Sequence, residues 1–273
     1  MSRMKLKRGI LDLVVASALW GTIGIATQVG YEEGAGSFQV IVFRNLTATL
    51  LVVLAFRDLR AILNKASVVM GVIATLFYEV YIYSVEVLGA SLSAVFLYTA
   101  PVWVVLASRR LGDRLTWRKV LASLLVVVGV YLIYFSRISL TDLGWGLASG
   151  LTYAFLIVYS RYMQLKGFKD RDILASQSVW SLPFSLLFLP LYPQVDEASI
   201  ATGAYLGVVA TFLAYLFFYR GMRATDSITA TVISSLEPVF TIVFALVLLH
   251  QTLTPLQYLG SGIIILSSFL VSL

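Results

Sequence analysis

The chain contains no cysteine and only one histidine, His250, among its 273 residues. Without cysteine it forms no disulfide and has no thiolate for redox chemistry or metal binding, and one imidazole cannot build a metal site by itself. There is also no Gly-rich phosphate loop followed by lysine, which argues against an ATP-driven motor within this chain. We therefore expect no metal, no cofactor and no enzyme, because an intramembrane enzyme needs a nucleophile–base pair or a metal cluster.

Charge is also scarce, since only 12% of the residues are charged whereas 59% are hydrophobic. A mean hydropathy of +0.90 excludes a soluble domain of ordinary composition. About 20 helical residues cross a bilayer core, and the apolar stretches are separated by short loops that leave no room for a soluble domain. We predict an all-α integral membrane protein with ten transmembrane helices, near residues 9–30, 37–56, 67–85, 89–108, 117–136, 142–163, 173–191, 199–220, 227–249 and 255–272.

The basic residues are distributed unevenly between the two sides of this predicted bundle. Of the 20 Lys and Arg residues, 18 lie at the N-terminus or in every second gap between spans: Arg3, Lys5, Lys7, Arg8, Arg57, Arg60, Lys65, Arg109, Arg110, Arg114, Arg118, Lys119, Arg161, Lys166, Lys169, Arg171, Arg220 and Arg223. Of the two remaining cations, Arg137 lies in one of the other gaps and Arg44 lies inside a predicted span. Cations favour the cytoplasmic side, so we expect a cell-membrane protein with both termini in the cytoplasm. The net charge of +6 is explained better by contact with anionic lipid head groups than by binding to a nucleic acid.

Two halves of the chain resemble each other. The tract from Tyr83 to Pro101 matches the tract from Tyr219 to Pro238, and Leu-Thr precedes the last span of each half, at Leu115 and at Leu253. Residues 1–137 and 138–273 would then each form a five-helix repeat. Because five is an odd number of spans, the second repeat enters the bilayer from the opposite side, and such inverted-topology repeats are typical of transporters that work by alternating access.

Three charged residues lie inside predicted spans, where ionisable side chains are rare and expensive. Arg44 would tie helices together or anchor a substrate carboxylate or phosphate through its bidentate donors. Glu79 lies in the same outer half of the bilayer, so it could pair with Arg44. Glu237 is nearly central in span 9, where an unpaired carboxyl favours the protonated form. Glu237 would couple transport to protons, bind a substrate ammonium, or hydrogen-bond a neighbouring carbonyl.

Prolines and aromatic residues mark further candidate positions. Pro101 and Pro238 occupy equivalent places in spans 4 and 9, where each would kink its helix, either as a static bend or as a hinge beside a cavity. Most aromatic side chains in membrane helices pack or sit at the interface. The four nearest the span centres are our candidates to line a cavity: Trp20, Tyr98, Tyr153 and Tyr215. Pairs of small residues, Gly203 with Gly207 and Gly144 with Ala148, permit close helix contacts.

These residues carry a resemblance to a known family. The chain resembles EamA-type members of the drug/metabolite transporter superfamily in the order of several short motifs: Ala18-Leu19-Trp20-Gly21, Phe43-Arg44-Asn45, Pro101, Leu236-Glu237-Pro238-Val239 and the two Leu-Thr pairs. The resemblance implies ten spans in two five-helix repeats, with spans 4 and 9 lining a central cavity. One departure is that Asp113 and Gln251 stand where the family often has Glu before Leu-Thr, so Asp113 is expected to be only a helix-end contact.

The sequence therefore favours a secondary transporter that moves a small polar metabolite around a midplane site. A pocket of Tyr and Trp beside one Arg and one Glu suits a zwitterion, which favours an amino acid, and export is the favoured direction. The resemblance keeps other cargoes open, namely nucleotide sugars, vitamins and sugar phosphates, because a fold does not settle chemistry. A channel or an intramembrane enzyme is a weaker alternative. We expect a monomer or homodimer in the lipid bilayer, with a small-molecule substrate and protons as a candidate coupling ion.

Overall fold

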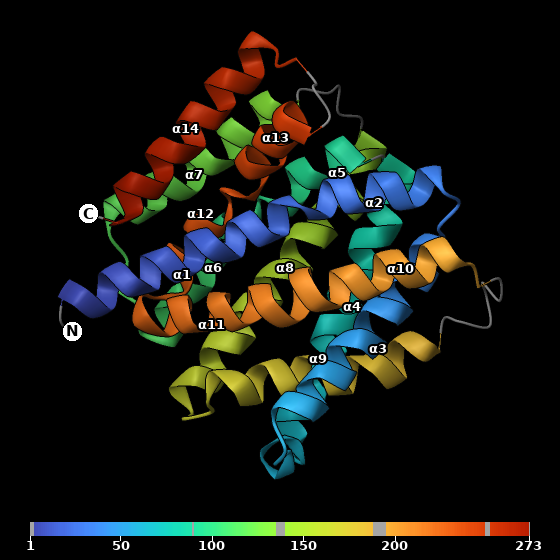
Figure 1. Ribbon diagram of the computed structural model, residues 1–273. Helices are drawn as coiled ribbons and strands as arrows, with labels where there is room; N and C mark the ends of the chain where they lie inside the picture. The colour runs from blue at the N-terminus through green and yellow to red at the C-terminus, as the bar shows by residue number, and fades with distance from the viewer. Residues whose placement is uncertain (1–2, 89, 135–139, 188–194, 249–251, 273) are drawn as a thin grey trace.

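The computed structural model describes residues 3–88, 90–134, 140–187, 195–248 and 252–272. All regular structure in these ranges is helical, and none of it is β-strand (Figure 1). Arg137, His250, Gln251 and the predicted boundary between residues 137 and 138 lie outside the described residues.

The helices follow one another with short connections. In chain order they are α1 (Arg3–Gly21), α2 (Ile23–Glu32), α3 (Ser37–Ala55), the 3-10 turn η1 (Arg60–Ile62), α4 (Lys65–Leu88), α5 (Ala90–Leu97), α6 (Ala100–Leu111), α7 (Trp117–Ile133), α8 (Leu140–Leu165), α9 (Asp170–Leu186), α10 (Glu197–Tyr205), the π-helical segment η3 (Leu206–Leu213), α11 (Ala214–Ala224), α12 (Ser227–Ser234), α13 (Glu237–Leu248) and α14 (Pro255–Ser272).

Within the described ranges, eight helical stretches are long and apolar enough to cross a membrane, which fits a multi-pass membrane protein. They are Met4–Glu32, Ser37–Ala55, Lys65–Val85, Leu92–Leu111, Leu143–Leu165, Glu197–Ala224, Ser227–Leu248 and Pro255–Ser272. The other two predicted spans coincide with α7 and α9, which are 17 residues long each. At about 1.5 Å per residue, such helices reach somewhat less than the thickness of a bilayer core. The total of ten spans therefore stays a prediction.

Several predicted spans are not single continuous helices. The first is interrupted at Thr22, between α1 and α2. The fourth is interrupted between α5 and α6, and the ninth between α12 and α13, so Pro101 and Pro238 each become the second residue of a new helix. Proline has no N–H to donate to the carbonyl four residues earlier and clashes with it, which explains a break at both prolines.

The helices pack in pairs that are distant in the sequence. Helix α7 lies along α14, and α1 lies along α11 (Figure 1). Glycines allow the first pair to approach closely, because a Cβ on Gly129 would come within 2.9 Å of the Gly260 carbonyl oxygen. Helix α4 packs on α8 and α9, and α3 packs on α10 and η3. Of the broken spans, α12 and α13 pack on α1, and α5 and α6 pack on α8.

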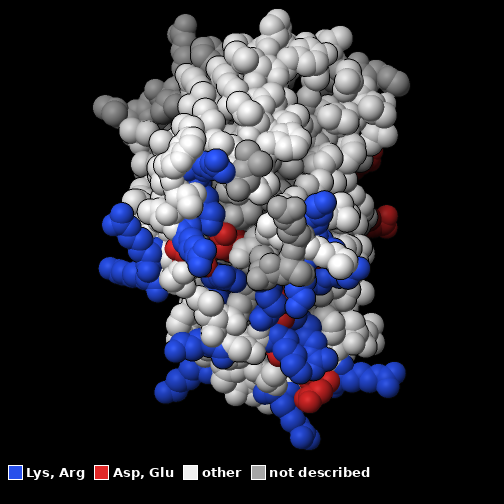
Figure 2. Space-filling model, turned by 90° about the vertical axis from the view of Figure 1, so that its left-hand side faces the viewer, with Lys and Arg blue, Asp and Glu red and all other residues white. Residues whose placement is uncertain are grey.

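Charged side chains gather at one part of the surface. Figure 1 shows both termini on the same side of the molecule, and Figure 2 shows Lys and Arg gathered in the middle and lower parts of that side. Ion pairs link helices here, including Arg220 with Asp12 at 2.9 Å and Lys119 with Asp226 at 2.7 Å. We call this region the basic end of the molecule.

Candidate functional site

A cavity of about 690 Å³ lies within the bundle, a size typical of small-molecule sites. Aromatic and aliphatic side chains from both halves of the chain form most of its wall, and its charged lining residues are Arg44, Glu237 and Glu32. At the C-terminal end of α2, the exposed residues Gln28, Tyr31 and Glu32 form a rim. The cavity therefore reaches the surface at this end of the molecule.

Arg44 enters the cavity from α3 and is held on two sides. Its Nε donates a hydrogen bond of 2.7 Å to Thr211 Oγ1, in the π-helical segment η3. Its guanidinium carbon lies 4.5 Å from the centre of the Tyr78 ring, within range of a cation–π interaction. Among the described residues, no carboxylate forms an ion pair with Arg44. The Arg44 side chain thus links α3 to η3 through Thr211, and its positive charge remains available to bind a ligand.

The predicted partnership between Glu79 and Arg44 is wrong. Glu79 is not among the lining residues of the cavity, and its buried Oε2 has no hydrogen-bond partner among the described residues. The reason is helical geometry: Glu79 follows Tyr78 on α4, and consecutive helical residues point about 100° apart. Because Tyr78 occupies the face that meets Arg44, Glu79 is turned away from it.

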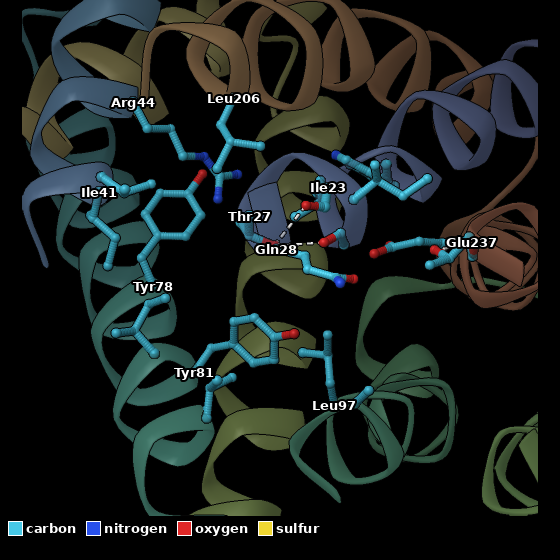
Figure 3. Close-up of a pocket in the computed structure, with 18 of the residues that line it drawn as sticks. Ile23, Thr27, Gln28, Ile41, Arg44, Tyr78, Tyr81, Leu97, Leu206 and Glu237 are labelled. Atoms are coloured by element: carbon cyan, nitrogen blue, oxygen red, sulfur yellow. Dashed lines mark hydrogen bonds between the residues drawn. The ribbon is translucent and has the colours of Figure 1, made fainter. Parts of the chain in front are cut away.

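Glu237 is the first residue of α13, directly after the interruption in the ninth span. Figure 3 shows its side chain and Arg44 reaching into the cavity from opposite sides, with Gln28 between them. Arg44 is near enough to act on Glu237 electrostatically, yet the two form no ion pair. Tyr98 lies close to Glu237, but its buried hydroxyl has no hydrogen-bond partner within the described part of the chain. The Glu237 carboxyl and the Tyr98 hydroxyl are therefore both available to a ligand.

All four aromatic residues that we selected line the cavity: Trp20, Tyr98, Tyr153 and Tyr215. Trp20 is fixed by a 2.7 Å hydrogen bond from its Nε1 to the Ala210 carbonyl and by edge contact with Tyr215 at 5.1 Å. The ring of Tyr153 stacks on Phe77 at 4.8 Å. These contacts indicate a rigid aromatic wall.

Pro101 and Pro238 are buried and are not lining residues, although each stands beside residues that are. Leu97 and Tyr98 line the cavity just before the break that precedes Pro101, and Glu237 lines it next to Pro238. The helix breaks at the two prolines therefore determine where Leu97, Tyr98 and Glu237 lie along the cavity wall. Whether the breaks act as hinges stays a prediction.

Sequence reasoning missed several polar lining residues, among them Gln28, Tyr78 and Tyr81 (Figure 3). Tyr78 and Tyr81 were visible as aromatic residues within a span, but hydropathy does not say which face of a helix points inward. A usable signal did exist for Gln28. Trp20, Gly24, Gln28 and Tyr31 recur at helical spacing and form one face of the first span, which meets the cavity.

The basic end of the molecule is closed beneath the cavity by a buried charged contact. Asp113 accepts from Arg161 Nη2 at 3.0 Å, and its other oxygen accepts from the backbone N–H and the hydroxyl of Ser227 at 3.0 and 2.6 Å. Its side chain is 3% exposed. Asp113 is therefore much more than the helix-end contact we expected, because it joins the end of α6 to α8 and to the start of α12.

Comparisons with known proteins bear on the family and the fold of the chain. The model of the EamA-like transporter family matches residues 7–135 and again residues 141–273. An uncharacterized transporter of Archaeoglobus fulgidus is 28% identical over 273 residues, covering 98% of this chain and 97% of that protein. The threonine/homoserine exporter RhtA of Escherichia coli is 24% identical, covering 95% and 89%. A solved crystal structure shares the fold, with a TM-score of 0.83 at 17% identity over 96% of this chain and 95% of that chain.

Proposed function

The chain belongs to the EamA-like transporter family of membrane proteins, and we propose that it is a secondary transporter that exports an amino acid by alternating access. The observation that carries this proposal is the placement of Arg44 and Glu237. They face each other across one aromatic cavity, and neither is neutralised by an ion pair with a described residue. A zwitterion has complementary charges, so its carboxylate would meet Arg44 and its ammonium would meet Glu237.

The lining of the cavity also favours an amino acid over the other cargoes carried by similar transporters. Among the described residues, the charged lining residues are one cation, Arg44, and two acids, Glu32 and Glu237. A sugar phosphate or a nucleotide sugar carries one or more negative charges and no ammonium. The two carboxylates of the cavity would repel such an anion, and only the guanidinium of Arg44 would attract it. The aromatic wall around Trp20 and Tyr153 suits an apolar side chain. The similarity to a threonine/homoserine exporter points in the same direction.

We propose ten spans in two inverted repeats, residues 1–137 and 138–273. The packing supports this arrangement, because exchanging each span with its counterpart five positions away returns the most extensive helix pairs. The contact of α1 with α12 and α13 corresponds to that of α8 with α5 and α6. The contact of α1 with α11 corresponds to that of α8 with α4, and α7 with α14 corresponds to itself. The two halves could then exchange roles during transport.

We further propose that the basic end faces the cytoplasm and that the cavity rim faces outward, which makes this conformation the outward-open one. The support is the gathering of Lys and Arg at the basic end, since cations favour the cytoplasmic side. Glu237 would couple export to proton entry, because a carboxyl between the rim and the closed end can exchange a proton for a substrate ammonium. Protons are then the coupling ion.

Transport by the purified protein tests the proposal. Proteoliposomes loaded with radiolabelled L-threonine or L-leucine should release label faster than protein-free vesicles, and an inward proton gradient should accelerate release. A variant with Arg44→Ala and Glu237→Gln together serves as the negative control. In parallel, a panel of amino acids, sugar phosphates and nucleotide sugars is screened for thermal stabilisation of the protein in detergent. Stabilisation by a sugar phosphate, without any effect of amino acids, would sink the amino-acid assignment.

A further inference from the structure

We infer that Thr211 and Gln177, neither of which lines the cavity, are positioning residues that fix the guanidinium of Arg44 for end-on recognition of a carboxylate. The inference rests on the proposed function, in which Arg44 binds the substrate carboxylate. Both residues are buried, with exposed fractions of 1% and 0%. They act on Arg44 from two different elements, η3 and α9.

Thr211 acts on one edge of the guanidinium. Its hydroxyl accepts the hydrogen bond from Arg44 Nε at 2.7 Å, so Nε is no longer available to a ligand. The two terminal nitrogens, Nη1 and Nη2, then remain as the donor edge that can face the cavity. A carboxylate accepts two parallel N–H bonds from such an edge, whereas an amide offers one oxygen and presents an N–H group of its own. Fixing Nε therefore selects both the direction and the type of the ligand.

The π-helical segment explains how Thr211 comes to be in place. A π-helix widens the helical turn, and short π-helical segments are frequent at functional sites. Two consecutive residues of η3 accept hydrogen bonds from cavity side chains. The Ala210 carbonyl accepts one from Trp20 Nε1, and the Thr211 hydroxyl accepts one from Arg44 Nε. The close approach of η3 to α3 depends on Gly207, where a Cβ would come within 2.7 Å of the Arg44 carbonyl oxygen.

Gln177 acts on the face of the guanidinium through Tyr78. The Tyr78 ring lies under the guanidinium, and its hydroxyl accepts a 2.6 Å hydrogen bond from Gln177 Nε2. Gln177 is oriented in turn by Tyr219, whose hydroxyl donates to Gln177 Oε1. Because a glutamine amide can turn over by exchanging its two ends, this second bond determines which end meets Tyr78. Gln177 therefore holds the ring at the place where the guanidinium stacks.

The physical benefit is preorganisation. An arginine side chain has many rotamers, and ordering it at the moment of binding weakens affinity. With the Thr211 bond on one edge and the fixed Tyr78 ring below, Arg44 is ordered before the ligand arrives. Loss of either contact should reduce the preference for a carboxylate without changing the charge of the cavity.

The experiment compares two probes, radiolabelled L-threonine and its competitor L-threoninamide, which lacks the carboxylate. In proteoliposomes the wild type should prefer threonine, and Thr211→Val should raise the KM for threonine about tenfold, a change expected from one charge-assisted hydrogen bond. Inhibition by threoninamide should change little. Thr211→Ser, which keeps the hydroxyl, should restore the preference, and Gln177→Leu should lose it as Thr211→Val does. Thr202→Val, in α10 of the same span, is the matched control and should behave as wild type.

A second measurement does not depend on transport. In protein labelled with ¹⁵N at arginine Nε, the Arg44 signal is assigned by its loss in Arg44→Lys. Thr211→Val should shift this signal and speed its hydrogen exchange, and Thr211→Ser should restore both. If wild type fails to move threonine, the proposed function fails while this signal still decides the positioning role. An unchanged Arg44 signal in Thr211→Val, or equal losses of affinity for both probes, would overturn the inference.

Discussion

Asp113 and Arg161 form a buried ion pair, 3.0 Å from Oδ1 to Nη2, at the closed end of the molecule. The pair also contacts the start of α12 through Ser227, so one carboxylate connects three helices. The cavity reaches the surface at the opposite end, where its rim is formed by α2. In the alternating access that we propose, a barrier on one side must be able to open, and this contact is our candidate for that barrier.

Removing the charge of Asp113 should open the basic end. Loss of one partner from a buried pair leaves the other charge uncompensated, at a cost of about 3–5 kcal/mol to the closed arrangement. Because the native chain has no cysteine, Thr241→Cys provides a single reporter in the cavity wall. In Asp113→Asn, a membrane-impermeant thiol reagent should label this cysteine from the basic end as well as from the rim.

The matched control for Asp113→Asn is Arg220→Gln, which breaks the pair with Asp12. The Arg220 side chain is 54% exposed, and an ion pair at such a site contributes little. Labelling should then stay confined to the rim side. Equal labelling patterns in wild type and Asp113→Asn would contradict the role of Asp113 in closing this end.

Glu237→Gln should uncouple transport from protons. The amide keeps the shape of the side chain but cannot release a proton between pH 5 and 8, so substrate movement should no longer respond to an imposed pH gradient. The measurement is the rate of amino-acid release from proteoliposomes with and without that gradient. A variant that still follows the gradient would remove Glu237 as the coupling group.

Arg44→Ala should weaken substrate binding by about two orders of magnitude, because a bidentate charged contact is lost. Since the Thr211 bond and the Tyr78 contact also disappear, the protein should melt at a somewhat lower temperature in detergent. Binding is measured by ligand-induced thermal stabilisation. Arg57→Ala, an exposed cation outside the cavity, is the control and should leave affinity unchanged. Complete loss of the fold in Arg44→Ala would favour a purely structural role.

Pro238→Ala should slow transport while leaving substrate affinity nearly unchanged. Alanine restores an N–H group that can bond the Ser234 carbonyl, so α12 and α13 would tend to join into one continuous helix. If the break acts as a hinge, a joined helix exchanges conformations less readily. Turnover and KM in proteoliposomes separate the two effects. A normal turnover rate would leave the break as a static bend.

Gly207→Ala should destabilise the protein, whereas Gly144→Ala should not. At Gly207 a Cβ would meet both the Thr47 side chain and the Arg44 carbonyl oxygen, so η3 would be pushed from α3. At Gly144 nothing lies within 4 Å of a Cβ, and alanine favours a helix by about 1 kcal/mol. The melting temperatures in detergent should therefore move in opposite directions. Equal shifts of the melting temperature in the two variants would show that overpacking at Gly207 does not cause the destabilisation.

Much of the architecture could be predicted from the sequence because it depends on local properties. The apolar stretches near residues 37–56 and 255–272 correspond to α3 and α14. The interruptions at Pro101 and Pro238 follow from the covalent structure of proline. The choice of Arg44 and Glu237 as candidate ligand groups required only that a charge inside an apolar stretch needs protein or water around it.

Other features could not be predicted because they depend on how helices are turned and which ones meet. Asp113 was expected to be only a helix-end contact, since nothing local shows that Ser227 and Arg161 approach it from distant parts of the chain. For Asp113, tertiary contacts rather than hydropathy therefore decide the outcome.

The sequence by itself determined a helical membrane protein, with its cations in alternate gaps and its two central prolines in equivalent positions. Only the tertiary structure decided that Arg44 meets Thr211 and Tyr78 instead of Glu79. The physical reason is that hydropathy records how deep a residue lies along a helix but not its direction around the axis. That direction is determined by close packing against neighbouring helices, which the chain brings together from both halves.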